Sequence, residues 1–374
     1  MIFYRQFIER RDFEVLVLTD RSDISKPPLP NWIAVEPPRI IKRLQQTRLS
    51  RYAQAFALLT AGNWIPRGIL KALRDFRADL VYLGPDTAIA DLGIAIARKL
   101  NVPIAGHFMD WPTFTMNGPD WLMKFVERRY RARYAACDLA FGICPEMLEA
   151  LGPHRNSAVF YPIGNLPLEP PSSKPLPEGR PFRLLFAGNL GQWYGRMVLE
   201  LAKKVVCHPD FQLVVAGKCA NWTLEEEKWM VASGMYVGFL KGAEYDALFA
   251  AADGLLVCNG FTDEAQTIEA TNFKSKFVDY LASGLPIFIW APEGSSSASF
   301  SKREGVGILI SDTSPEAVEF AIANYLKSAD EEPIFTQTKW MRLRSFFDTA
   351  EVLPGVCRNI YQLIDNNLKS VETC

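Results

Sequence analysis

The sequence predicts an α/β protein with two domains, each built on a doubly wound parallel sheet. Short apolar runs alternate with amphipathic helical stretches along the whole chain, which is the rhythm of βαβ units. The length of 374 residues exceeds what one hydrophobic core usually spans. Seven prolines crowd the segment between the two halves, where missing N–H donors disfavour regular elements.

The first domain is expected over residues 1–161 and the second over 182–334, with the proline-rich segment 162–181 as the linker. The expected strands are short, buried apolar runs between helical stretches such as Ile40–Thr60 and Asp86–Leu100. In chain order these strands are Phe13–Leu18, Leu80–Leu83, Val102–Ala105, Leu139–Ile143, Arg183–Ala187, Gln212–Ala216, Met235–Val237, Gly254–Cys258, Pro286–Trp290 and Gly307–Ile310. The last segment, 335–374, carries apolar positions at helical spacing and is expected to pack back on the first domain.

The composition argues against several classes of protein. The net charge is only -1, which does not suit a chain that binds nucleic acid as a whole. The seven cysteines form no C-x-x-C pair, so neither a zinc site nor a disulfide framework is expected. No apolar run reaches the roughly 18 to 20 residues of a transmembrane helix, and Met1–Arg11 lacks the apolar stretch of a signal peptide. A cytoplasmic protein is expected.

A glycine-rich turn follows the first strand of the second domain. Residues Gly188–Gly195 have the sequence G-N-L-G-Q-W-Y-G and lead into a helix expected from Arg196. Glycines at a strand-to-helix turn let backbone N–H groups approach a phosphate, and the helix N-terminus favours its charge. The turn is neither G-x-G-x-x-G nor a P-loop, so a plain tight turn is the alternative interpretation.

The segment Thr271–Pro286 has the sequence T-N-F-K-S-K-F-V-D-Y-L-A-S-G-L-P. Lys274 and Lys276 lie in a loop that leads into a helix, and Asp279 lies on the first turns of that helix. Lysines at this place supply charge to a pyrophosphate, and an acid one turn later can accept both hydroxyls of a ribose. A solvated helix start is the alternative interpretation.

This segment resembles the donor-binding region of GT-B glycosyltransferases of the retaining group called family 4. In that group a lysine, an acid and a Y-L-A-x-G-x-P tail recur. Other pieces follow in the family's order, and they are F-A-G-N-L-G, V-V-A-G-K at Val214–Lys218, V-G-F-L-K at Val237–Lys241 and E-Y-D-A-L-F-A-A-A-D at Glu244–Asp253. The resemblance implies a GT-B architecture, with two Rossmann-like domains facing a central cleft. It also implies a nucleotide-diphosphate sugar as the donor substrate.

The donor site implied by the resemblance consists of residues from four segments of the second domain. They are expected to serve the phosphates (Gly188, Asn189), the nucleotide (Gly217, Lys218), the base (Gly238, Phe239), the pyrophosphate (Lys276), the ribose (Asp279) and, through their backbone, the transferred sugar (Asn272, Phe273, Lys274). No cofactor is expected. The sequence has no Asp-x-Asp motif, so a metal-independent enzyme is expected as well.

The chain departs from the family's pattern in three ways. The family commonly has an E-x7-E pair, and counting back from Asp279 places Thr271 at the first position, whereas Glu269 is two residues early. The basic pair that usually follows the first glycine of this domain is replaced, so Lys276 is expected to carry more of the phosphate charge. The usual first strand and glycine-rich acceptor loop are not recognisable before Phe13.

A second candidate site lies in the first domain. The sequence G-H-F-M-D-W-P at Gly106–Pro112 follows an expected strand, so His107 and Asp110 fall at its carboxyl end. Family members often carry a histidine here. His107 is therefore expected to polarise or position the acceptor hydroxyl, with Asp110 orienting it, as the catalytic pair. A purely structural histidine is the alternative interpretation.

The stretch Arg39–Arg77 interleaves nine basic residues with apolar ones. This pattern suits a helix that lies on an anionic membrane surface, and a lipid-linked acceptor would account for it. A core-packed helix with a solvated basic face is the alternative.

The expected reaction moves a sugar from the donor to a hydroxyl of a glycan or lipid-linked acceptor, with retention, in polysaccharide, glycolipid or cell-surface glycan biosynthesis. Two alternatives stay open. One is a nucleotide-sugar 2-epimerase on the same fold, and the other is a non-catalytic glycosyltransferase-like subunit, which Thr271 and the short start favour.

Overall fold

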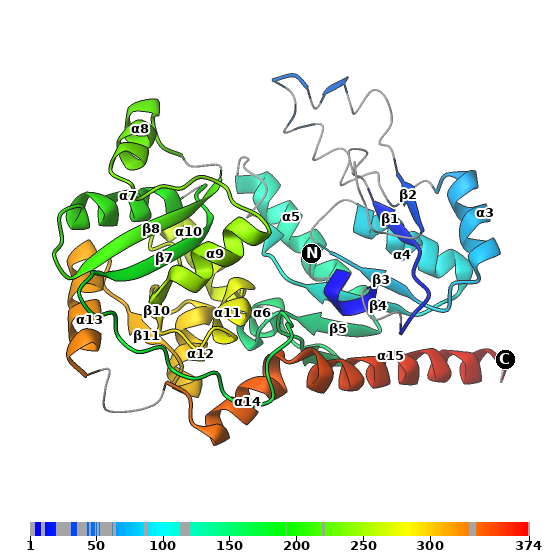
Figure 1. Ribbon diagram of the computed structural model, residues 1–374. Helices are drawn as coiled ribbons and strands as arrows, with labels where there is room; N and C mark the ends of the chain where they lie inside the picture. Colours follow the sequence, from blue (N-terminus) through cyan, green and yellow to red (C-terminus); the bar gives the residue numbers. More distant parts are fainter. Residues whose placement is uncertain are drawn as a thin grey trace. The chain divides into compact units, whose positions relative to one another are not determined.

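The computed structural model describes residues 4–8, 12–19, 31–35, 43–44, 46–48, 50, 52, 62, 65–85, 89–112, 120–191, 193–218, 221–328 and 334–372. The chain divides into two compact units, Met1–Ile163 with Thr349–Cys374, and Gly164–Asp348. Each unit has its own parallel sheet flanked by helices (Figure 1). The α/β class with parallel sheets that the sequence predicts is therefore confirmed.

The second unit is built on a five-stranded parallel sheet with the order β11-β10-β9-β7-β8. Its strands are β7 (Phe182–Asn189), β8 (Phe211–Lys218), β9 (Gly254–Cys258), β10 (Ile287–Trp290) and β11 (Ile308–Ile310). Strand β8 lies on one side of β7 and β9 on the other, so the direction of winding reverses between β7 and β9. Open α/β sheets bind ligands at such a switch point, beyond the carboxyl ends of the strands.

The helices of the second unit connect these strands and complete the unit after the sheet. They are α7 (Tyr194–Val205), α8 (Leu224–Ala232), α9 (Ala243–Ala251), α10 (Asp263–Thr271), α11 (Lys276–Leu281), α12 (Ser296–Glu304), α13 (Pro315–Ser328) and α14 (Gln337–Phe347). Hydroxyl caps fix where four of them begin, because each cap side chain accepts a bond from the backbone N–H three residues on. These caps are Thr223, Thr262, Ser295 and Thr336.

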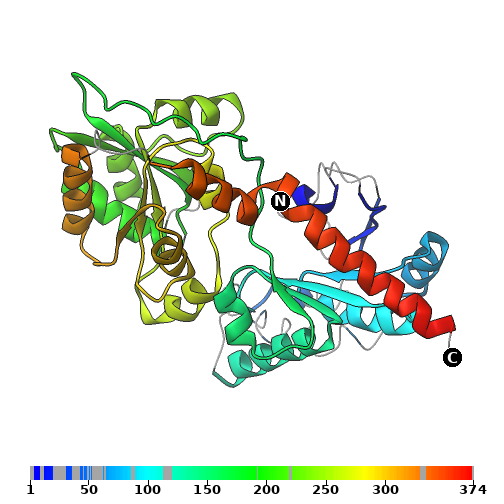
Figure 2. The ribbon, with the colours of Figure 1, turned by 90° about the horizontal axis from the view of Figure 1, so that it is seen from below.

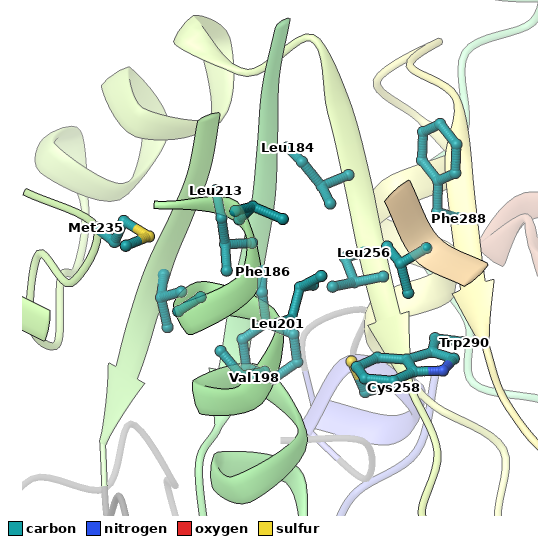
Figure 3. Close-up of a cluster of buried hydrophobic side chains, with 14 of the residues drawn as sticks. Leu184, Phe186, Val198, Leu201, Leu213, Met235, Leu256, Cys258, Phe288 and Trp290 are labelled. Atoms are coloured by element: carbon teal, nitrogen blue, oxygen red, sulfur yellow. The ribbon is translucent and has the colours of Figure 1, made fainter. Parts of the chain in front are cut away.

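The core of the second unit lies between the sheet and its helices (Figure 3). Buried side chains from β7, β8 and β9 pack against Val198 and Leu201 of α7. On the strands they include Leu184, Phe186, Leu213 and Leu256. Removing these apolar surfaces from water stabilises the sheet by roughly 25 cal/mol per Å². The sheet is thus a rigid base for the loops at its edges.

The first unit has a four-stranded parallel sheet with the order β3-β4-β5-β6. Its strands are β3 (Val81–Leu83), β4 (Ile104–Phe108), β5 (Leu139–Gly142) and β6 (Ser157–Val159). Its helices up to residue 151 are α3 (Arg67–Phe76), α4 (Ile89–Leu100), α5 (Asp120–Ala136) and α6 (Pro145–Leu151). A π-helical turn at Tyr4–Ile8 and a separate parallel pair, β1 (Val17–Thr19) with β2 (Trp32–Ala34), precede them.

The last helix, α15 (Thr349–Glu372), belongs to the first unit (Figures 1 and 2). Leu353, Val356 and Ile360 on this helix share a buried cluster with side chains of β4 and β5, such as Ala105 and Phe141. The apolar spacing after Thr349 therefore reflects packing against the first sheet, whereas α14, earlier in the same predicted segment, belongs to the second unit.

One expected strand of the second unit does not form. Met235–Val237 forms a single bridge, between Val215 and Tyr236, in place of a strand. Gly234 and Gly238, with φ of 74° and 80°, flank this segment and turn the backbone out of extended geometry on both sides. The helix expected at Ile40–Thr60 lies mostly outside the described residues, so this expectation stays a prediction. Within the described ranges, no helix combines the length and apolar character needed to cross a membrane.

Candidate functional site

The carboxyl ends of β7 and β8 bring two of the predicted glycines side by side. Gly188 pairs with Gly217, and Asn189 pairs with Lys218, in the parallel register of the two strands. A Cβ at Gly217 would lie 2.1 Å from the carbonyl oxygen of Gly188, so only glycine fits there. The missing side chain lets the two strand ends approach closely at the edge where a ligand is expected.

The turn after β7 begins with Asn189, which is exposed and whose side-chain oxygen accepts a bond from the N–H of Gly191 at 3.1 Å. The turn leads into α7, whose first residue is Tyr194. A Cβ at Gly195 would lie 2.2 Å from the carbonyl oxygen of Leu190, so the turn is tightly packed against the helix start. The backbone of this turn is thus held at the carboxyl end of β7.

An exposed aromatic ring lies next to the end of β8. The N–H of Gly217 donates to the carbonyl of Gly238 at 2.9 Å, which holds the segment that carries Phe239 beside the strand end. The side chain of Phe239 is 52% exposed, and the ammonium nitrogens of Lys218 and Lys241 lie 5.3 and 5.1 Å from its ring centroid. An exposed ring between two cations offers a flat face for a base and positive charge nearby.

Aromatic packing holds the segment that precedes α11 in place. Phe273 is buried against Phe277, Phe300 and Phe347, with ring centroids 5.6, 5.3 and 5.7 Å away. The hydroxyl of Ser296 donates to the carbonyl of Asn272 at 2.5 Å. These contacts therefore fix the backbone at Asn272 and Phe273, directly before Lys274 and Lys276.

Lys276 is the first residue of α11 and is half-buried. Its Cε would lie 3.9 Å from a Cβ placed on Gly188, so its side chain reaches the end of β7. Burial lowers the pKa of this ammonium, and the charge of Asp279 acts in the opposite direction. Asp279 lies in the first turn of the same helix and is exposed. The structure thus brings Gly188, Lys276 and Asp279 to one edge of the second unit.

Lys274 has a different environment from Lys276. Its ammonium lies 2.7 Å from the carboxylate of Glu269 and donates to the hydroxyl of Tyr194 at 2.7 Å. Burial disfavours the charged lysine, but Glu269 and Tyr194 more than offset this and raise the pKa of Lys274. The pKa of Glu269 is lowered, because Lys274 and the other hydrogen bonds outweigh its burial. The charge of Lys274 is therefore matched within the protein.

Glu269 also lies at this edge, and the sequence does not predict it as a site residue. It is completely buried on α10, and its donors come from positions distant in the chain. The sequence shows an acid five residues before Lys274, but the donors at 193, 194, 259 and 260 become its neighbours only in the fold.

His107 and Asp110 belong to the first unit, where the structure gives the histidine an interior position. Strand β4 extends to Phe108, beyond the predicted end at Ala105, so His107 lies within the sheet. Its ring is fully buried and stacked on Phe160, with the ring centroids 4.9 Å apart. Its Nε2 lies 2.9 Å from the carbonyl oxygen of Phe160. Burial lowers the pKa of His107 to about 3, although the bond to Phe160 acts in the opposite direction. The imidazole is therefore neutral at physiological pH.

Part of the basic stretch Arg39–Arg77 lies outside the described residues. Its described helix, α3, buries Ile69 and Leu73 in the first unit, and Lys71 and Arg74 are exposed. In this part of the stretch, apolar residues face the core and basic residues face solvent.

No protein-family model and no curated protein sequence matches the chain. Among solved structures, the chain is similar to HepE from Anabaena in complex with UDP, with a TM-score of 0.58 and 14% identity over 94% of this chain and 100% of that one. It is also similar to a glycosyltransferase from Rickettsia africae, with a TM-score of 0.59 and 13% identity over 95% and 90% of the two chains. A third similar structure is sucrose-phosphate synthase from Thermosynechococcus elongatus, with a TM-score of 0.55 and 14% identity over 81% of each chain. The chain therefore has the GT-B fold, as the sequence resemblance implies.

Proposed function

We propose that this protein is a glycosyltransferase that moves a sugar from a nucleotide-diphosphate sugar to an acceptor hydroxyl. The observation that carries the proposal is the half-buried Lys276, which reaches the end of β7 at the switch point of the second sheet. UDP is bound in one structure of the same fold, and UDP-glucose in another. The proposal thus joins two observations, a ligand class bound by other proteins of this fold and a cation at the edge where such sheets bind ligands.

Lys276 is assigned the diphosphate in this proposal. Burial already lowers the pKa of Lys276, so a bound diphosphate would supply the negative charge that favours the ammonium. When the bond to the sugar breaks, negative charge grows on the departing nucleoside diphosphate. A fixed cation at that position stabilises the developing charge without reorganising. We extend the proposal to a metal-independent reaction, because Lys276 supplies the positive charge and the sequence has no Asp-x-Asp motif.

The rest of the donor is assigned to the same edge. The exposed ring of Phe239 is proposed to stack on the base, with Lys218 and Lys241 beside it. Asp279, one turn after Lys276, is proposed to accept the ribose hydroxyls. Gly188 and Asn189 are proposed to offer backbone N–H groups to the phosphates, since no side chain shields the backbone at Gly188.

The acceptor is assigned to the first unit, with His107 and Asp110 as the residues that the sequence points to. Since His107 is neutral and its ring is fully buried against Phe160, we propose that it helps to position the acceptor side of the first unit and is not a charged acid. A glycan or lipid-linked acceptor, retention at the anomeric carbon and a role in cell-surface glycan synthesis complete the proposal. These parts rest on the sequence resemblance.

A panel of nucleotides tests the proposal directly. We expect UDP or GDP to raise the unfolding temperature of the wild-type protein, and we expect the corresponding nucleotide sugar to be consumed faster when an acceptor is present. Consumption that needs no acceptor and yields the 2-epimer would favour the epimerase alternative. A protein that no nucleoside diphosphate stabilises would support the non-catalytic alternative and overturn the proposal.

Membrane binding through the stretch Arg39–Arg77 is a separate part of the proposal. Basic residues are interleaved with apolar ones along this stretch, as in segments that bind anionic lipid, and on α3 the basic residues Lys71 and Arg74 are exposed. We expect the protein to float with vesicles that contain phosphatidylserine, and less so at high salt. Equal flotation with neutral vesicles, or none at all, would contradict this part and leave the donor site unaffected.

A further inference from the structure

One buried carboxylate holds together three segments of the second unit. The side chain of Glu269 accepts bonds from five groups of the described residues. On Oε1 the donors are Trp193 Nε1 at 2.9 Å, the Tyr194 hydroxyl at 2.5 Å and the Gly260 N–H at 3.1 Å. On Oε2 they are Asn259 Nδ2 at 2.6 Å and Lys274 Nζ at 2.7 Å.

These donors come from three separate segments at the edge of the sheet. Trp193 and Tyr194 follow β7 and begin α7, whereas Asn259 and Gly260 directly follow β9. Lys274 lies in the segment between α10 and α11. The winding of the sheet reverses between β7 and β9, so the carboxylate bridges the two sides of the switch point.

The third segment carries the residue that is proposed to bind the diphosphate. Lys274 precedes Lys276 by two residues, and Lys276 reaches back to Gly188 at the end of β7. Fixing Lys274 against Glu269 therefore fixes where α11 begins relative to β7. The position of a charged group matters for binding, because a misplacement of about 1 Å can cost about 100-fold in activity.

We propose that Glu269 is a positioning residue of the donor site, which sets the separation between Lys276 and the turn after β7. This inference rests on the proposed function. Glu269 touches no substrate in it and acts through Lys274, Tyr194 and the two strand ends. A buried carboxylate with five donors is fully satisfied, so it specifies one arrangement of these segments.

The same sheet offers a matched control. Asp253 is also a buried carboxylate between β7 and β9, but it lies at their amino ends. It accepts from Arg180 at 2.6 and 3.0 Å and from the N–H of Arg183 at 2.9 Å, and Lys174 lies 3.0 Å away. Its loss should weaken the sheet without moving Lys276.

The test compares Glu269→Gln with Asp253→Asn in the full-length protein by titration calorimetry, with UDP and GDP as probes. The tighter-binding probe is then followed in each variant. Calorimetry separates two effects, because a loss of folded protein lowers the number of sites per chain, whereas a misplaced Lys276 raises the Kd. We expect Glu269→Gln to raise the Kd about tenfold, and Asp253→Asn to leave the Kd within about twofold.

A gentler variant keeps the test decisive if Glu269→Gln does not fold. Tyr194→Phe removes only the hydroxyl that bonds to both Glu269 and Lys274. We expect it to raise the Kd about threefold with a full number of sites. The positioning role is overturned if wild type binds the probe, Lys276→Met loses it, and the folded Glu269 or Tyr194 variant binds as wild type does. If wild type binds neither probe, the proposed function itself fails.

Discussion

Glu269 and Asp253 are buried carboxylates at opposite ends of the same two strands, β7 and β9. At the amino ends, Asp253 is bonded to two long cations that are about one-third exposed, Arg180 and Lys174, and to one backbone N–H. At the carboxyl ends, Glu269 has no exposed surface, and its donors lie on the loops that carry the candidate site. The same chemical group thus joins strands at one edge and shapes a site at the other.

The largest expected effect is at the carboxyl edge itself. Gly217→Ala places a Cβ 2.1 Å from the carbonyl oxygen of Gly188, so the ends of β7 and β8 must separate. We expect the free energy of unfolding to fall by about 3 kcal/mol or more, measured by urea denaturation. Gly294→Ala is the control, because no atom lies within 4 Å of the added Cβ, and it should change stability by less than about 0.5 kcal/mol. Equal stability of both variants would contradict the close approach.

Substitution of Lys276 should affect binding more than folding. Lys276→Met keeps the apolar length of the side chain and removes the charge proposed to bind the diphosphate. We expect UDP affinity to fall by about 2 kcal/mol, or about 30-fold, with a stable fold. Lys203→Met on α7 is the control, because Lys203 is an exposed lysine paired on the surface with Glu200. If both variants bind UDP equally well, Lys276 is not part of the donor site.

Asp253→Asn should affect folding more than binding. We expect the free energy of unfolding to fall by about 1 to 2 kcal/mol at pH 7, because the ion pairs with Arg180 and Lys174 are lost. The loss is limited because both cations are partly exposed and regain water. Burial alone would raise the pKa of the Asp253 carboxyl, but the bonds from Arg180, Arg183 and Lys174 have the larger effect. The net pKa therefore lies below the ordinary 3.8. The unfolded chain then takes up the proton first, so this stabilisation is present above about pH 4 and is lost as the pH falls through the folded pKa. Urea denaturation should show a smaller difference in the free energy of unfolding between wild type and Asp253→Asn at pH 3 than at pH 7. An equal difference at both pH values would contradict the lowered pKa of Asp253.

The smallest expected effect concerns the first unit. Because burial lowers the pKa of His107 to about 3, its imidazole should stay neutral between pH 5 and pH 8. An NMR titration, with the His107 signal assigned by its loss in His107→Gln, should show no change over this range. Titration near the ordinary value of 6.5 would mean that the ring is not enclosed as described.

Local patterns predict most of the fold. The run Gly254–Cys258 is β9 without change, since a short apolar run between turns suits a central parallel strand. The run at Val102–Ala105 gives β4, but the strand continues to Phe108 because His107 pairs with Phe141 in the sheet. A polar residue inside a strand interrupts the apolar pattern, so neither the strand's length nor the burial of His107 could be predicted.

The candidate site is predictable only where its residues are contiguous. Lys276 and Asp279 lie on one helix turn, so their spacing carries the signal. Glu269 has no comparable signal, because its donors at residues 193, 194, 259 and 260 are brought to it by two different strands. Long-range contacts of this kind depend on strand order, which the pattern of one chain does not determine.

The central claim, that a nucleotide diphosphate binds at Lys276, is tested most directly by observing this ammonium during binding. Lysines labelled by reductive ¹³C-methylation give separate NMR signals, and the Lys276 signal is the one missing from Lys276→Arg. We expect added UDP to shift this signal and to raise the pKa of Lys276, because the diphosphate offsets the burial that lowers it. A Lys276 signal and pKa that stay unchanged at saturating UDP would contradict the account.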